Sequence, residues 1–400
     1  MEEKWEIMGQ PLSEVLAEAE ELKEAGERRV LSVNWLPGEY WGKNNEVATR
    51  DSIRVFANAV GDANPLWMNP EYAKQTTFGC IIAPPLYLGC IATGWGATVF
   101  RRAGNDWVPA LRRYIGFNAG SRWARFQEVR EGDSFTVYDI FKGMEERKSH
   151  VPGAPPMVLS QIDRTYVNQR GEVAAINSMR VIAMATPLGQ KEYTRPANVA
   201  DITQPYKYTD EELEAIEHAY LAEERRGAST RCWEDAVEGA ELKPVVKGPV
   251  ITDDAVAFIG AVGLMQRAYG LRLLLVDKER HQFNPEDNTP AGLQTGHVYD
   301  GLLQGRSEGG NMPTIAGAQV ETWLGHLITN WMGDEGFLKV LDSQHRRVAR
   351  FRDTYWCHGR VAKKYVEGGE HLVDLELWTE NQQGIKHTLA KAMVRLHPRK

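Results

Sequence analysis

One stretch of the sequence decides how the chain is expected to fold, and it reads Phe56-Ala57-Asn58-Ala59-Val60-Gly61-Asp62-Ala63-Asn64-Pro65-Leu66-Trp67. The apolar residues before Gly61 recur at helical spacing, which predicts a short amphipathic helix beginning near Asp51. Gly61 ends that helix, and Pro65 fixes the turn that follows. The turn therefore aims the carboxylate of Asp62 and the amide of Asn64 into whatever the helix packs against.

This stretch resembles the signature of the MaoC-like, hotdog-fold enoyl-CoA hydratase/dehydratase family. The signature reads roughly Gly-Asp-x-Asn-Pro, then a hydrophobic residue and a His, with an Ala six residues after the His. The matching positions are Gly61, Asp62, Asn64, Pro65, Leu66 and Ala73. The His position holds Trp67, which cannot shuttle a proton. The resemblance thus implies the family's fold, with one acid–base group missing from the first half of the chain.

The second half of the chain repeats the first in outline. Residues 253–263 lie over residues 51–61 without a gap, and Asp353-Thr354 stands where Asp133-Ser134 stood. The turn at residues 381–384 likewise answers the Asn-Gln-x-Gly turn at residues 168–171. Two apolar segments, residues 86–100 and residues 325–331, are predicted to be buried helices. The repeat is far longer than the repeating unit of a solenoid protein, so the pattern indicates a duplicated domain.

The resemblance and the duplication together predict an α+β fold of the double-hotdog type, with two antiparallel sheets each wrapped around a central helix. We expect an N-terminal, dehydratase-like hotdog domain at residues 1–185 and a C-terminal hotdog domain at residues 231–400. Residues 186–230 are expected to be a linker followed by a charged helix, because Thr209 and Glu212 form a capping box.

Composition excludes several classes of protein. The 400 residues carry a net charge of -7, so no general attraction to nucleic acid is expected. No apolar run approaches the roughly 18 residues of a membrane span. The four cysteines form no Cys-x-x-Cys pair, which argues against a zinc site and favours a cytoplasmic protein with free thiols. No dinucleotide or phosphate-loop motif is present, so we expect neither a metal nor a redox cofactor.

In the family, an Asp and a His act together on water and substrate, and N–H groups near the start of the central helix hold the thioester oxygen. The resemblance assigns Asp62 and Asn64 to this machinery, although Asp62 could instead only organise its turn. Trp67 could fill the core or an interface, or form a flat wall for a bulky acyl group or the CoA adenine. Pro85 falls near the usual oxyanion Gly and has no N–H to donate.

In the second half, His297 stands where the family's His would, and Gly317 can take the oxyanion role. The partner acid is left open among three nearby carboxylates, Asp300, Asp287 and Glu286. Asp62 could also serve, provided that the two halves face each other.

We also predict the roles of two further side chains in the second half. Tyr299 is assigned, with Trp67 and Gly317, to substrate binding. His326 lies in the apolar segment and is expected to be a buried, hydrogen-bonded histidine rather than a base.

The resulting hypothesis is an enzyme that adds water to, or removes it from, a bulky α,β-unsaturated acyl-CoA. A catalytically degenerate acyl-CoA-binding or structural subunit is the first alternative, because each half has lost part of its acid–base pair. Another thioester reaction on the same fold is the second. The expected partner is the acyl-CoA substrate, with no nucleic acid and no membrane. The chain is expected to form homo-oligomers, or hetero-oligomers with an active partner.

Overall fold

The computed structural model describes residues 5–7, 10–26, 29–30, 45–91, 117–148, 155–187, 206–263 and 315–399. Within these ranges, none of the helices combines the length and apolar character needed to cross a bilayer.

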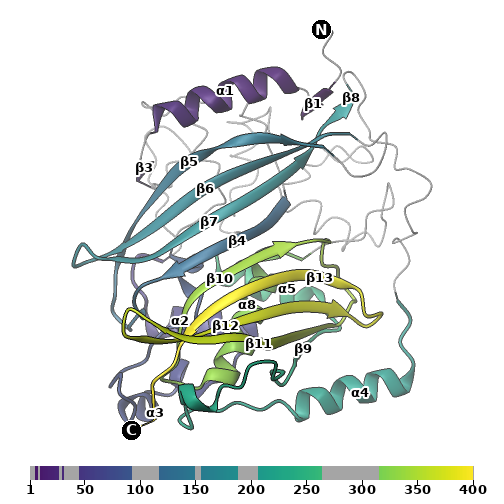
Figure 1. Ribbon diagram of the computed structural model, residues 1–400. Helices are drawn as coiled ribbons and strands as arrows, with labels where there is room; N and C mark the ends of the chain where they lie inside the picture. The colour runs from purple at the N-terminus through teal and green to yellow at the C-terminus, as the bar shows by residue number, and fades with distance from the viewer. Residues whose placement is uncertain are drawn as a thin grey trace.

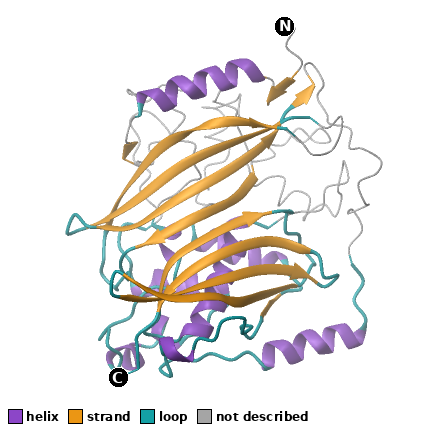
Figure 2. Cartoon of the chain, in the orientation of Figure 1, coloured by secondary structure: helices purple, strands orange, loops and turns teal. Residues whose placement is uncertain are grey.

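Most of the strands form one antiparallel sheet of ten strands, in the order β3-β5-β6-β7-β4-β10-β13-β12-β11-β9 (Figures 1 and 2). Their bounds are β3 Arg29–Val30, β4 Phe117–Arg125, β5 Phe135–Arg147, β6 Met157–Asn168, β7 Val173–Met184, β9 Val245–Lys247, β10 Phe337–His345, β11 Tyr355–Glu367, β12 Glu370–Asn381 and β13 Lys386–Arg395. A small second sheet joins β2 (Gln10–Pro11), β1 (Trp5–Ile7) and β8 (Thr186–Pro187). In this order, β5-β6-β7-β4 form a first four-stranded set and β10-β13-β12-β11 form a second, and the two sets lie edge to edge. The short strand β3 flanks the first set, and the short strand β9 flanks the second.

The two sets meet where β4 pairs with β10. Trp123 lies opposite Leu341 in this register, and the bonded stretch is three residue pairs long. Gly120 makes the close approach possible, because a Cβ atom there would lie 2.1 Å from the carbonyl oxygen of Ser343. The two expected hotdog sheets are therefore joined into one continuous sheet at this seam.

The helices cover the inner side of the sheet. The central helix α8 (Gly317–Met332) is buried along its length from Gln319 onward, as expected for the apolar segment of the second half. Beside it lie α2 (Arg50–Val60) and α5 (Thr252–Ala261), which are in contact with each other. In the first half, the segment that was expected to be a helix from residue 86 begins as a buried 3-10 helix at Tyr87–Cys90. Its remainder, residues 92–100, lies outside the described residues.

Three other helices lie at the margins. α1 (Leu12–Ala25) packs one apolar face over β5, and α3 (Pro70–Lys74) follows the Asp62 turn. α4 (Asp210–Leu221) is the predicted charged helix, and it carries the predicted capping box of Thr209 and Glu212. The domain limits at residues 185 and 230 stay predictions.

The duplication is visible in matching hydrogen bonds at the two hairpin turns. In the first half, Gln169 Nε2 donates to Asp133 Oδ1 at 2.8 Å. In the second half, Gln382 Nε2 donates to Asp353 Oδ1 at 2.7 Å. Each glutamine also accepts the backbone N–H of the residue that follows the aspartate. The two halves therefore fold their corresponding turns with the same contacts.

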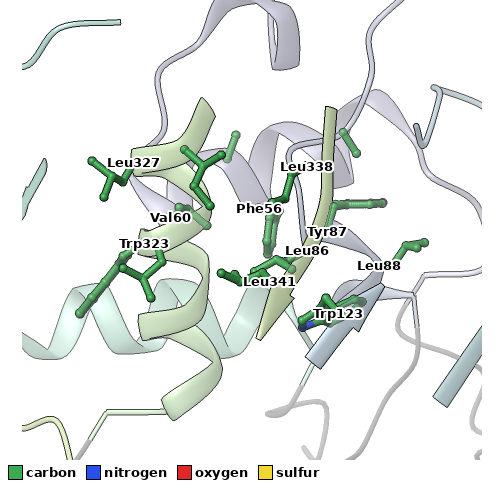
Figure 3. Packing of buried hydrophobic residues seen from close by; sticks show 14 of the residues in the cluster. Phe56, Val60, Leu86, Tyr87, Leu88, Trp123, Trp323, Leu327, Leu338 and Leu341 are labelled. Carbon is green, nitrogen blue, oxygen red and sulfur yellow. The ribbon is translucent and has the colours of Figure 1, made fainter. Parts of the chain in front are cut away.

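One large apolar core runs through both halves (Figure 3). Phe56 and Tyr87 of the first half meet edge to face in it, with ring centroids 5.7 Å apart. Trp323 and Leu327 of α8 belong to the same cluster, as does Leu341 of β10. The side chains that precede the Asp62 turn are thus packed against the central helix of the second half.

Candidate active site

The Asp62 turn is built by its own side chains. Gly61 closes α2 in a left-handed conformation with φ of 71°, which glycine adopts without strain. Asp62 Oδ1 then accepts the backbone N–H of Asn64 at 3.1 Å, and Asn64 Oδ1 accepts that of Leu66 at 3.0 Å. The Asn64 amide also donates to Asp334 Oδ1 at 2.9 Å. The turn is thereby rigid and tied to the second half.

Asp62 faces the central helix of the second half. Thr329 Oγ1 donates to Asp62 Oδ2 at 3.3 Å. The Nε2 atom of His326, one turn earlier on α8, lies 3.8 Å from Asp62 Oδ1. Asp62 is 2% exposed and His326 is 1% exposed. A carboxylate of one half and an imidazole of the other therefore meet in a buried site.

Lys247 of β9 supplies the positive charge of this site. Its Nζ atom lies 2.8 Å from the carbonyl oxygen of Val60, 3.3 Å from that of Gly61 and 2.9 Å from His326 Nδ1. An ammonium group has three N–H donors, so these three acceptors satisfy it completely. Burial lowers the pKa of Lys247, while the carboxylates of Glu223 and Asp62 act in the opposite direction.

The lysine contact fixes which nitrogen of His326 carries the proton. Because the ammonium of Lys247 can only donate, Nδ1 must accept, and the proton lies on Nε2. That Nε2 is 3.1 Å from Glu223 Oε1 as well as 3.8 Å from Asp62 Oδ1. Burial opposes ionisation of Glu223, but hydrogen bonds from His326 and Asn330 and the nearby charges outweigh it and lower the pKa of Glu223 to about 2. Glu223 is thus within hydrogen-bond distance of the imidazole N–H, and Asp62 lies somewhat farther from the same nitrogen.

The structure brings together some of the residues that the sequence predicts to be in the active site. Asp62 and Asn64 are buried side by side, and His326 is buried and hydrogen-bonded as expected. Trp67 is 3% exposed within the core, and its indole Nε1 finds no acceptor among the described residues. The nominated residues His297, Tyr299 and Asp300 lie outside the described residues, as do Glu286 and Asp287.

Gly317 is the first residue of α8, far from the Asp62 turn. At the rise of an α-helix, nine residues separate Gly317 from His326 by roughly 14 Å along the axis. A Cβ atom at Gly317 would lie 2.7 Å from His345 Nε2, so the glycine permits close packing at the helix start. Gly317 and the Asp62–His326 pair therefore cannot act on one small reacting group.

Three features of the site were not foreseen from the sequence. The pairing of His326 with Asp62 depends on how the two halves meet. Lys247 did carry a signal, because it is a single cation within the apolar run at residues 245–250, and such a residue is buried only with partners. Glu223, just after α4, carried none. No group of three or more His, Cys, Asp or Glu side chains in the described ranges is placed to hold a metal ion.

Comparison with known proteins gives one family model. Residues 36–177 match the model described as the FAS1-like dehydratase domain region. Two curated relatives also match parts of the chain. An "UPF0336 protein" of Streptomyces avermitilis is 33% identical over 98 residues, which are 24% of this chain and 61% of that protein. A "Probable enoyl-CoA hydratase alpha subunit" of Thermomonospora curvata is 27% identical over 138 residues, 32% of this chain and 43% of that protein. The chain thus spans less than two thirds of each relative.

Solved structures resemble nearly the whole chain. A "MaoC-like dehydratase" superposes with a TM-score of 0.58 at 15% identity, covering 93% of this chain and 98% of its own. A conserved hypothetical protein of Mycobacterium tuberculosis with a double hotdog fold superposes with a TM-score of 0.50 at 12% identity, covering 93% and 96%. At such low identity the likeness concerns the fold, and it confirms the predicted α+β double hotdog.

Proposed function

We propose that this chain is a MaoC-like hotdog hydratase or dehydratase that acts on acyl thioesters. The match of residues 36–177 to a dehydratase model supports the reaction class, as does the relative that is named an enoyl-CoA hydratase subunit. The substrate would be a bulky α,β-unsaturated acyl-CoA or its 3-hydroxy partner. The twelve tryptophans and fourteen tyrosines of the chain suit an aromatic-lined pocket for such a group.

One observation carries the proposal: Asp62 Oδ1 and His326 Nε2 lie 3.8 Å apart across the two halves. Trp67 occupies the family's His position, and no imidazole of the first half lies next to Asp62 among the residues that the structure describes. His326 of the central helix supplies one from the other side. Lys247 holds the ring in the tautomer that carries its proton on Nε2, the nitrogen near both Glu223 and Asp62.

This geometry suits the addition of water across a Cα–Cβ double bond. Asp62 takes the proton that the attacking water loses as the oxygen bonds to Cβ. His326 donates its Nε2 proton to Cα as its Nδ1 takes a proton from the ammonium of Lys247, so that the ring stays neutral. The proton on Asp62 then returns to Nε2 and the Nδ1 proton returns to Lys247, which regenerates the site. Gly317 and His297 belong to the alternative site in the second half.

The test is the absorbance of the conjugated enoyl thioester. The purified chain is given crotonyl-CoA and a panel of aromatic enoyl-CoAs, and hydration removes the absorbance. We expect His326→Gln to lower the rate by about 10²–10⁴-fold, while the exposed His218→Gln leaves it unchanged. If His297→Ala abolishes hydration and His326→Gln does not, the imidazole belongs to the second-half site.

A second candidate is an acyl-CoA-binding subunit without activity of its own. The observation that favours it is that Asp62 is almost fully buried and engaged by Asn64 and Thr329, while Trp67 fills the core. Such a subunit would show no loss of enoyl absorbance and no release of free CoA to a thiol reagent, yet acyl-CoA would raise its melting temperature. Release of free CoA would instead identify a thioester hydrolase.

A further inference from the structure

A row of polar side chains crosses the inner face of the first four-stranded set, where a hotdog sheet would normally be apolar. In the strand register, Asp139 of β5 lies opposite Arg164 of β6, and Arg164 lies opposite Asn177 of β7. Asn177 in turn lies opposite Trp123 of β4. All four are buried. Burying polar groups costs free energy unless they are paired, so each member of this row needs a partner.

The charged members of the row satisfy each other. Arg164 Nε donates to Asp139 Oδ1 at 2.8 Å, and its terminal nitrogen donates to Oδ2 at 2.8 Å. This two-pronged contact neutralises both charges. Asn177 is different: it is 7% exposed, and its Oδ1 has no hydrogen-bond donor among the described residues. An unpaired buried acceptor is costly, which indicates that something else donates to it.

Asn177 opens onto a cavity of about 60 Å³ between the two halves. Its apolar lining includes Phe56 and Leu86 of the first half (Figure 3) and Phe258 of α5. Its polar lining includes Asn177 and Ser121 of the first set of strands, together with Glu321 of α8. One water needs about 10–15 Å³ of such space, so the cavity has room for roughly four to six small atoms.

The carboxylate in the cavity wall is already compensated. Glu321 accepts the hydroxyls of Ser121 at 2.7 Å and Ser343 at 2.9 Å, and it lies 3.4 Å from His345 Nε2. Although burial opposes ionisation, these contacts lower the pKa of Glu321. Neither Glu321 nor Arg164 therefore requires an opposite charge from an occupant of the cavity.

We propose that this cavity binds an uncharged hydrogen-bonding group on a short aliphatic stem, such as a primary amide or a hydroxyl. The group donates to Asn177 Oδ1, and the stem lies against Phe56 and Phe258. An ionic group of the same size is rejected, because it would bring an uncompensated charge into a buried site. The occupant can be a free small molecule or the polar end of an acyl group, and only the second source rests on the proposed function.

The test uses three molecules of similar size with a three-carbon skeleton: propionamide, propionate and propylammonium. We expect saturation-transfer NMR with the full chain to give a dissociation constant at least tenfold lower for propionamide than for either ion. Asn177→Leu should weaken propionamide binding at least tenfold, while the exposed Asn58→Leu should not. Asn177→Asp, which keeps the size of the side chain, should reverse the preference in favour of propylammonium.

Equal binding of the three molecules, or propionamide binding that Asn177→Leu leaves unchanged, would overturn the proposal. So would a crystal soaked in propionamide that holds only water beside Asn177. Competition then separates the two sources of the ligand. A CoA thioester whose acyl chain ends in a hydroxyl displaces propionamide if the cavity receives the acyl end, and fails to do so if the ligand is a free molecule. Neither readout depends on catalysis, so failure of the proposed reaction leaves this test intact.

Discussion

Replacing Lys247 by Met should destabilise the protein strongly, because it removes the only positive charge that contacts His326 in the described part of the chain, next to the carboxylates of Asp62 and Glu223. Two backbone carbonyls, at residues 60 and 61, lose their donor at the same time. Each buried acceptor left without its donor costs about 1–3 kcal/mol, so two carbonyls and one imidazole nitrogen together cost roughly 3 kcal/mol or more. Since whole domains are stable by only about 5–15 kcal/mol, the change is a large fraction of the total.

The assay is urea unfolding followed by tryptophan fluorescence at pH 7. Lys74→Met is the matched control, because the Lys74 side chain is 62% exposed in an ion pair with Glu71, and such pairs contribute less than about 1 kcal/mol. Adding Asp62→Asn to Lys247→Met should recover part of the loss, since it removes a charge that has lost its partner. A loss below about 1 kcal/mol for Lys247→Met would refute the interpretation of the cluster as a set of mutually compensating charges.

Two further predictions concern pH and the seam between the halves. The pKa of Glu223 is about 2 in the fold, below the value of about 4.3 for a free glutamate, so its contribution to the free energy of unfolding is present above about pH 4.3 and lost as the pH falls toward 2. Unfolding measured between pH 2 and 6 should show this loss, and Glu223→Gln should remove it. Gly120→Ala should cost at least about 2 kcal/mol by forcing a Cβ atom against Ser343. Gly260→Ala, on an open helix face, should be neutral or stabilising, and equal effects of the two alanines would contradict the seam geometry.

Much of the fold could be predicted because its signals are local. The Gly61 helix end and the Asx contacts of Asp62 and Asn64 follow from residues within one turn. The hairpin turns around Gln169 and Gln382 are likewise local, and their equivalence revealed the duplication. The helix ends and hairpin turns of each half could therefore be predicted from short segments of sequence.

The site itself depends on contacts between segments that are far apart in the sequence. The sequence predicted correctly that His326 is buried and hydrogen-bonded, but not that its ring faces Asp62. That pairing arises because α2 packs beside α8 once β4 and β10 have joined the two sets of strands. No local sequence pattern predicts how β4 and β10 pair. The sequence alone therefore points to nearby carboxylates such as Asp300 as the acid of the second half.

The most direct test of the central claim is a double-mutant cycle on kcat/KM with Asp62→Asn and His326→Gln. If the two side chains act as one unit across the halves, each single variant loses about 10²–10⁴-fold and the double variant loses no more than the worse of the two. Losses that multiply in the double variant, or a His326→Gln protein with the rate of the unaltered chain, would contradict it.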